Sequence, residues 1–247
     1  MYTTILSLWG WFIIITLTLF YTTLSFLLFL PLYPFSPKKC HELFHSVAVL
    51  WAKSIIGAFP FWSLKVSLPK YDWKREKVYL FIANHQSIVD ILVALASIPI
   101  PFRFMAKKEL FSIPFLGLHM RMAGYIPVDR AAPQSRRQAL EQARLTLQQN
   151  ISVLMFPEGT RSLDGNIQKF KPGAFGLAVS ERVPVVACIF DGTGNAIPKK
   201  SWRLSESSKF KVLILEPEYF LAGLETADVM NKVRTQMMTH LEEARKL

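Results

Sequence analysis

The sequence predicts an α/β domain with a mostly parallel sheet covered by helices, behind an N-terminal pair of membrane-associated helices. Residues 5–30 are apolar or hydroxylic almost throughout, with Gly10 the one exception. Beyond about Ser63, short β-rich runs alternate with helical stretches, which is typical of a parallel sheet with helices on its faces. We therefore divide the chain into a membrane-associated two-helix segment, residues 1–62, and an α/β domain, residues 63–247.

The first apolar run, Ile5–Leu30, is long enough to cross a bilayer, for which about 20 apolar residues suffice. Three prolines follow it and end the helix. A cleaved signal peptide fits poorly, because no Lys or Arg precedes the run and the run is too long. Lys38 and Lys39 come next, so the positive-inside bias predicts that the rest of the chain lies on the cytoplasmic face of a membrane, the inner membrane in a bacterium.

A second apolar stretch, Leu43–Trp62, contains a single formal charge, Lys53, which a long side chain can carry to the membrane surface. Together the two stretches predict two membrane-associated helices. Two arrangements fit this pattern: the helices cross the bilayer, or they form a hairpin that lies in one leaflet.

Charge and cysteine content narrow the class of partner. The formal net charge is +11, which suits nucleic acid, a phospholipid surface or a phosphorylated substrate. All of the charge lies beyond residue 37, behind one long apolar segment, and this favours a membrane surface over nucleic acid. The two cysteines, Cys40 and Cys188, fit neither a metal-ligand spacing nor a disulfide framework, which agrees with a cytosolic face.

The domain is expected to alternate strands and helices in chain order. Strands are expected at Lys77–Asn84, Phe102–Ala106, Gly124–Val128, Ile151–Pro157, Val183–Phe190 and Phe210–Glu216. Amphipathic helices are expected at Ser135–Asn150 and Glu225–Lys246.

The stretch "NHQSIVD" follows the first of these strands. His85 falls in the strand-to-helix turn and Asp90 in the first turn of the helix, so the two side chains can face each other. A carboxylate bonded to one ring nitrogen fixes the tautomer and leaves the other nitrogen to accept a proton from a hydroxyl. No protein nucleophile stands beside them, which assigns that hydroxyl to a substrate. A second interpretation also fits, because Ser87 and Asp90 have the spacing of a helix capping box.

A rival histidine motif lies upstream. "HELFH", residues 41–45, matches the zinc-protease pattern in which two histidines bind the metal and a Glu acts as base. The chain offers only His85, His119 and His240 as further histidine ligands, none at a familiar spacing. The simpler interpretation is that the motif opens an interfacial helix.

Polar and charged residues also follow three other strand-like runs: Lys107 and Lys108, then Asp129 and Arg130, then the turn from Glu158 to Arg161. Ligands of α/β sheets bind outside the carboxyl ends of the strands. Arginine offers a forked donor for phosphate and lysine a point charge, while Gly159 permits close backbone approach. Taken one at a time, the three clusters are typical of a solvated helix start, a surface ion pair and a turn, respectively. Taken together with His85 and Asp90, they indicate an anion-binding site.

Four stretches in this order resemble the motifs of the glycerolipid acyltransferases: "NHQSIVD", "GYIPVDR", "FPEGTRS" and "VPVV". The resemblance runs from about Val78 to Phe190 and is greatest to the 1-acyl-glycerol-3-phosphate, or lysophosphatidic acid, acyltransferases. It implies an α/β domain behind two membrane helices. It also implies transfer of an acyl chain from coenzyme A or acyl carrier protein to the free hydroxyl of 1-acyl-glycerol-3-phosphate, which gives phosphatidic acid. Glycerol 3-phosphate or another lysolipid as acceptor would keep every motif.

The same resemblance implies roles for individual residues. His85 would be the general base, oriented by Asp90. No metal and no tightly bound cofactor is implied, and the partners are the lysophospholipid, the acyl thioester and the bilayer, not nucleic acid. The implied substrate-binding residues are Lys107, Arg130, Glu158, Gly159, Thr160 and Arg161.

Overall fold

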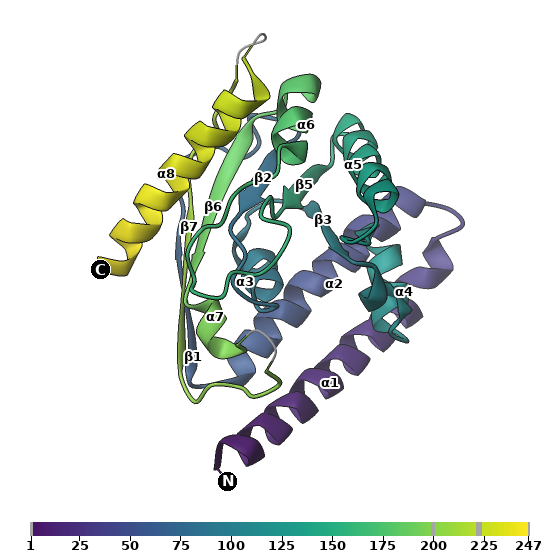
Figure 1. Cartoon of the computed structure of the whole chain (residues 1–247). Helices are drawn as coiled ribbons and strands as arrows, with labels where there is room; N and C mark the ends of the chain where they lie inside the picture. Colours follow the sequence, from purple (N-terminus) through teal and green to yellow (C-terminus); the bar gives the residue numbers. More distant parts are fainter. Residues whose placement is uncertain (1, 199–200, 221–223, 247) are drawn as a thin grey trace.

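A seven-stranded sheet forms the centre of the molecule, with strand order β1-β7-β6-β2-β5-β3-β4 (Figure 1). The structure is a computed structural model that describes residues 2–198, 201–220 and 224–246. The strands are β1 (Trp62–Ser67), β2 (Leu80–Ala83), β3 (Phe102–Lys107), β4 (Ile126–Val128), β5 (Ser152–Met155), β6 (Val185–Asp191) and β7 (Ser208–Ile214). Neighbours pair in parallel except β6 with β7. The predicted mostly parallel sheet is confirmed.

Helices cover both faces of this sheet. The elements outside it are α1 (Tyr2–Phe29), η1 (Leu30–Leu32), α2 (Pro37–Ala58), α3 (Asp90–Ser97), η2 (Lys108–Ser112), α4 (Leu116–Met122), α5 (Pro133–Gln148), α6 (Gly173–Glu181), α7 (Thr193–Ala196) and α8 (Thr226–Lys246). Side chains of α2 and α3 share one core cluster with one face of the central strands. Those of α5, α6 and α8 share a second cluster with the other face. Alternate residues of each strand point to opposite faces, which separates the two clusters.

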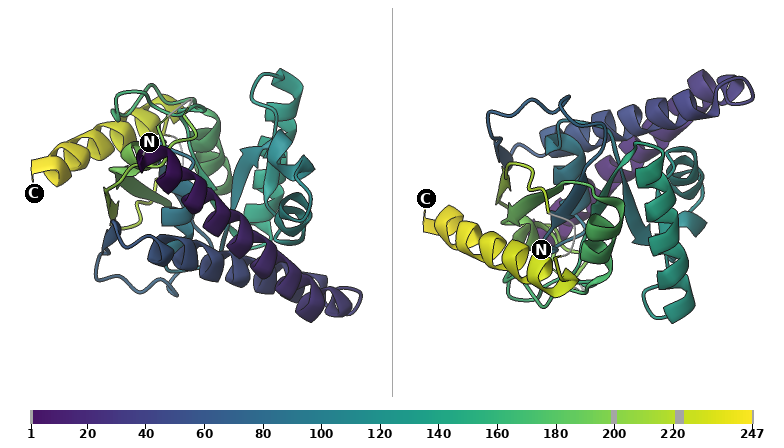
Figure 2. Two further views of the ribbon diagram at one scale, coloured as in Figure 1. Left: turned by 90° about the horizontal axis from the view of Figure 1, so that it is seen from below. Right: turned by 90° about the horizontal axis from the view of Figure 1, so that it is seen from above.

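α1 is the most apolar helix and lies outside the α2 layer. It packs against α2 and α4, and in Figure 2 it is nearest the viewer from below and behind α5, α6 and α8 from above. The span Thr3–Leu32 is long and apolar enough to cross a membrane, and only 11% of its most apolar window is buried. Large side chains such as Trp9, Phe12 and Leu27 are exposed. An exposed apolar helix of this length indicates membrane association.

α2 differs from α1 because one of its faces belongs to the domain core. Cys40, Phe44, Ala52 and Ile55 are fully buried, and the helix packs against α3 and β1. The expected boundary after residue 62 falls at the first residue of β1, a strand that the sequence did not predict. Its pattern is buried at Trp62 and mostly exposed beyond, so it lacks the apolar run that marks a central strand.

Candidate active site

The carboxyl ends of the parallel strands bring the predicted polar clusters to one edge of the sheet. β2 ends before His85, β5 before the Phe156–Arg161 turn, and β4 before Arg130. β2 pairs with both β5 and β6, so the residues that follow β2, β5 and β6 are spatial neighbours. This edge is where ligands bind in open α/β sheets.

His85 and Asp90 meet in the turn that leaves β2. The Nδ1 atom of His85 lies 2.6 Å from Oδ2 of Asp90, and Asp90 is fully buried. An ionised carboxylate only accepts hydrogen bonds, so the shared proton belongs to Nδ1 and the lone pair to Nε2. Among the described residues Nε2 has no hydrogen-bond partner, and 9% of the side chain remains exposed. This nitrogen is therefore available to a substrate hydroxyl.

Asp90 also performs the capping that the second interpretation expected. Its Oδ2 atom accepts the N–H groups of Gln86, at 2.7 Å, and Ser87, at 2.9 Å. The reciprocal bond of a capping box is missing: the N–H of Asp90 donates to the backbone carbonyl of Ser87 rather than to its hydroxyl, and that hydroxyl donates to the carbonyl of Ile197. The two interpretations are thus not exclusive: one carboxylate oxygen holds both the turn backbone and the imidazole.

Thr193 is a site residue that the sequence analysis missed. Its hydroxyl donates a short hydrogen bond to Oδ1 of Asp90, across 103 positions of sequence. The preceding residue, Gly192, has a φ of +81°, and a β-carbon there would lie 2.1 Å from the carbonyl oxygen of Lys209, so the turn before Thr193 packs closely against β7 and requires glycine. Thr193 also follows a strand, β6, so the strand-end rule applied to uncharged residues would have found it.

The turn after β5 fixes His85 from the opposite side. The ring of Phe156 lies against the imidazole, with centroids 4.4 Å apart and planes 30° apart. The Glu158 carboxylate accepts the N–H of His85 at 2.7 Å and that of Gln168 at 3.1 Å. Burial raises the pKa of Glu158 to about 7, against the smaller effect of these two donors. Glu158 therefore supports the catalytic turn rather than facing the solvent.

The predicted cations gather at this edge to different degrees. Arg130 donates to the carbonyl of Gly159 at 3.2 Å. Burial, and secondly the positive charge of Arg161, lower the pKa of Arg130. Lys107 ends β3 but pairs with Glu109 at 3.0 Å, and 63% of its side chain is exposed. Thr160 is exposed in the same turn as Gly159. Substrate contact by these residues stays a prediction.

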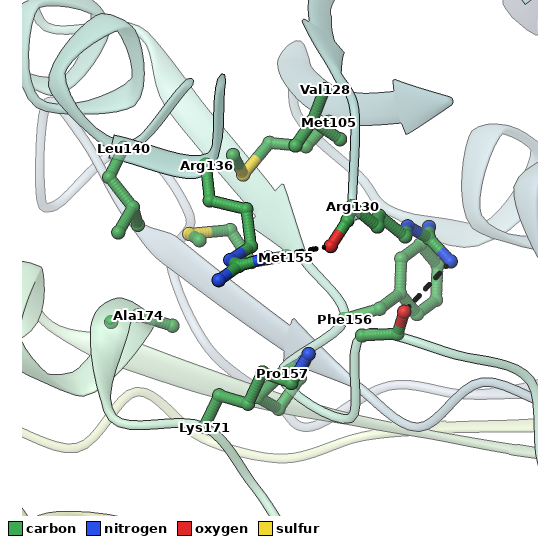
Figure 3. Close-up of a pocket in the computed structure, with 12 residues that line it drawn as sticks. Met105, Val128, Arg130, Arg136, Leu140, Met155, Phe156, Pro157, Lys171 and Ala174 are labelled. Carbon is green, nitrogen blue, oxygen red and sulfur yellow. Dashed lines mark hydrogen bonds between the residues drawn. The ribbon is translucent and has the colours of Figure 1, made fainter. Parts of the chain in front are cut away.

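A cavity of about 220 Å³ opens beside this turn, between the ends of β3, β4 and β5 and the helices α5 and α6. Figure 3 shows Arg136 and Lys171 pointing into it, whereas the guanidinium of Arg130 lies beside the Phe156 ring. The apolar side chains of Met105, Val128, Leu140, Met155 and Phe156 line the rest.

The rival histidine motif lies elsewhere, on α2. The Nδ1 atom of His41 is 2.6 Å from the carbonyl oxygen of Met122, and that of His45 is 3.1 Å from the Tyr125 hydroxyl. Glu42 between them is exposed. No group of three or more His, Cys, Asp or Glu side chains within the described ranges is placed to hold a metal ion. The two histidines are used to pack α2 against α4 and β4.

Comparison with known proteins agrees with this geometry. The acyltransferase family model matches residues 66–191, just over half of the chain, and this stretch contains His85, Asp90, Arg130, Arg161 and Lys171. The chain belongs to the acyltransferase family. The resemblance noted in its four motifs is thereby confirmed.

Individual members of the family support the same assignment. A chloroplast 1-acyl-sn-glycerol-3-phosphate acyltransferase of Arabidopsis thaliana is 32% identical over 212 residues, covering 84% of this chain and 56% of that protein. The 1-acyl-sn-glycerol-3-phosphate acyltransferase alpha of Mus musculus is 33% identical over 169 residues, covering 67% of this chain and 59% of the mouse protein. The chain thus spans a little more than half the length of these curated relatives.

A solved structure is similar over nearly its whole length. The crystal structure of the 1-acyl-sn-glycerophosphate acyltransferase PlsC from Thermotoga maritima matches with a TM-score of 0.72 and 26% identity. The match covers 92% of this chain and 96% of the PlsC chain.

Proposed function

We propose that this chain transfers an acyl chain from an acyl thioester to the free hydroxyl of 1-acyl-sn-glycerol-3-phosphate, giving phosphatidic acid. The observation that carries the proposal is the 2.6 Å contact between His85 and Asp90 with Nε2 available. The names of the relatives support the choice of acceptor, since both the chloroplast and the mouse protein are called 1-acyl-sn-glycerol-3-phosphate acyltransferases.

The reaction follows from the positions of the two ring nitrogens. Nε2 of His85 takes the proton of the acceptor hydroxyl as its oxygen attacks the thioester carbonyl carbon, and a new C–O bond forms. Collapse of the tetrahedral intermediate breaks the C–S bond, and the imidazolium returns the proton to the departing thiolate. Asp90 stabilises the imidazolium in between. Products are the ester and a free thiol, so the protein ends in its starting state.

The acceptor phosphate is proposed to bind at the guanidinium groups of Arg130 and Arg161. Planar guanidinium groups bind phosphate oxygens through two parallel hydrogen bonds. Lys107 can contribute when its surface pair with Glu109 opens, because exposed ion pairs contribute only about 0–1 kcal/mol. Glu158, Gly159 and Thr160 are proposed to shape the same site, with Glu158 acting through the backbone of His85.

Membrane attachment is proposed to place this chemistry at the cytoplasmic face. The exposed side chains of α1 are apolar, while Lys38 and Lys39 at the start of α2 suit a cytoplasmic headgroup region. Acyl chains of donor and acceptor could then reach the site without crossing water.

The test uses purified protein in detergent micelles with a panel of acceptors and both acyl-coenzyme A and acyl-carrier-protein donors. We expect the largest kcat/KM with 1-acyl-sn-glycerol-3-phosphate and a loss of at least about 10²-fold in His85→Ala, the usual range for a lost acid–base group. Faster turnover of glycerol 3-phosphate or of another lysolipid would reassign the acceptor. Near wild-type turnover by His85→Ala would overturn the mechanism.

A further inference from the structure

Arg136 and Lys171 are two cations that the reaction described above does not use. Both line the cavity beside the Phe156 turn, and Figure 3 shows both pointing into it. Nζ of Lys171 has no hydrogen bond or ion pair within the described part of the chain. The Nη1 atom of Arg136 donates hydrogen bonds to the backbone carbonyls of Arg130 and Ala131. Within the same described part of the chain, Arg136 pairs with no carboxylate. Arg136 is half-buried and Lys171 is exposed, and cations that lack an internal anion suit an anionic ligand.

Phe156 links the cavity to the reacting centre. Its side chain forms part of the cavity wall, and its ring packs against the His85 imidazole. A β-carbon added at Gly159 would lie 2.6 Å from Nζ of Lys171, so this ammonium group lies over the turn whose Glu158 holds the backbone of His85. A ligand in the cavity therefore contacts the Phe156 side chain, which packs against the proton acceptor.

The position of the cavity separates it from the membrane side of the fold. Its walls come from α5, α6 and the ends of β3, β4 and β5, and these two helices cover the sheet face opposite α2. α1, with its exposed apolar side chains, lies beyond α2 (Figure 2). A group that enters between α5 and α6 comes from water, whereas lipid tails reach the site from the α1 side.

The lining defines the chemistry of that group. Most of it is apolar, from Met105, Val128, Leu140 and Met155, and its cations are Arg130, Arg136 and Lys171. A volume of about 220 Å³ is below the roughly 300–1,000 Å³ of sites that enclose a whole small molecule, so the cavity takes part of a longer ligand.

Given the proposed function, on which this step rests, we infer that the cavity binds the 4′-phosphopantetheine arm of the thioester donor, with its phosphate at Lys171 and Arg136. This arm has a phosphate at one end, a dimethyl-substituted chain in the middle and the thioester at the other end. It is common to coenzyme A and acyl carrier protein, so the inference concerns the shared arm. Arg130 and Arg161 remain with the acceptor.

The experiment compares three donors of equal acyl chain: acyl-coenzyme A, acyl-4′-phosphopantetheine and acyl-pantetheine, which lacks the phosphate. In the full-length protein, Lys171→Gln should raise the KM for the first two donors roughly tenfold, the usual effect of one charge-assisted hydrogen bond. It should leave acyl-pantetheine and the acceptor KM unchanged. Arg136→Gln should act in the same direction. Arg137→Gln is the matched control, since its exposed neighbouring guanidinium lies outside the cavity lining.

Two outcomes overturn the inference: a rise confined to the acceptor KM, which would give both cations to the acceptor phosphate, or an equal loss with acyl-pantetheine. Acyl carrier protein is tested as a fourth donor, because it has the phosphopantetheine arm but not the nucleotide of coenzyme A. If Lys171→Gln raises the KM for acyl-coenzyme A alone, Lys171 binds the nucleotide and the inference is also wrong. If the wild-type protein transfers no acyl chain at all, the proposed function fails. Calorimetric binding of 4′-phosphopantetheine to wild type and Lys171→Gln then still tests the cavity, and equal affinities would reject it.

Discussion

His85 and Asp90 lie in a turn at the end of β2, whereas His41 and His45 lie one helical turn apart on α2. In the first region a carboxylate holds one imidazole nitrogen and the other nitrogen stays available. In the second, each histidine bonds to a separate group on α4 or just before β4, a carbonyl and a hydroxyl. The sequence motif alone does not distinguish a catalytic from a packing role, because both motifs contain histidine and an acidic residue. The hydrogen-bond partners of the Nδ1 atoms distinguish the two roles.

The two regions also differ in whether a substitution would affect turnover or stability. Around His85, backbone and side-chain bonds from β2, β5 and β6 converge on one carboxylate and one ring. Around His45, packing is the main contribution: the imidazole is 3% exposed and lies edge-on to Phe102, 5.1 Å between centroids. Changes in the first region should therefore alter turnover, and changes in the second should alter stability.

The largest predicted effect is a loss of stability at low pH, and it comes from His45 on α2 and His119 on α4. Burial, followed by the charge of Arg103, lowers the pKa of His45 to about 3, and burial lowers the pKa of His119 to about 4. Folding then favours the neutral imidazoles, so their contribution is complete above about pH 6.5 and is lost as the pH falls towards these values. At about 1.4 kcal/mol for each pKa unit, the free energy of unfolding should fall by several kcal/mol.

The measurement is the pH dependence of the unfolding midpoint in detergent, between pH 7 and pH 4. His45→Gln keeps a hydrogen-bond donor but does not titrate, so its midpoint should fall less steeply than that of the wild type. His240→Gln on α8 serves as control and should follow the wild-type curve. Identical slopes for His45→Gln and wild type would show that His45 does not contribute.

A smaller effect, on turnover, is expected from Thr193→Val. This variant keeps the shape of the side chain but removes the donor to Oδ1 of Asp90. A hydrogen bond to a charged group contributes about 1.5–3 kcal/mol, so kcat should fall roughly 10- to 100-fold. Both KM values should stay unchanged, because Thr193 acts through Asp90. Thr193→Ser should recover most of the rate; failure of serine to do so would mean that packing, not the hydroxyl, matters.

The smallest effect is expected from His41→Ala. Loss of the bond to the Met122 carbonyl should lower stability by about 1 kcal/mol and leave kcat within about twofold of wild type. A zinc enzyme built on His41, Glu42 and His45 would instead lose all activity. Steady-state assays with and without added zinc separate these results.

Much of the site could be predicted from sequence because its charged residues follow strands in order along the chain. That rule found His85, Arg130 and Arg161 without knowledge of the sheet order. It did not find Thr193, which lies more than a hundred residues from Asp90 and carries no charge. Lys171 was also missed, because it follows a loop of polar residues and gains its position only from the β5–α6 connection.

The fold shows the same limit. Strands β5 and β6 have continuous apolar runs, β3 is apolar apart from Arg103 and its last residue, and the predicted bounds of all three agree with the observed ones to within about two residues. β1 alternates Ser and Lys with apolar residues at the sheet edge, so its pairing with β7 depends on a contact with Phe210 and its neighbours that the local sequence does not contain. The separate two-helix segment, residues 1–62, stays a prediction, since α2 shares its core with the sheet.

The most direct test of the mechanism is kcat for Asp90→Asn. The variant keeps an oxygen that can accept from His85 and from the two backbone N–H groups, so the turn can keep its shape. It carries no charge, so the imidazolium formed during proton transfer loses its counter-ion. We expect kcat to fall about 100-fold or more, with unchanged KM values and an unchanged unfolding midpoint at pH 7. A kcat within about threefold of wild type would contradict a general base oriented by Asp90.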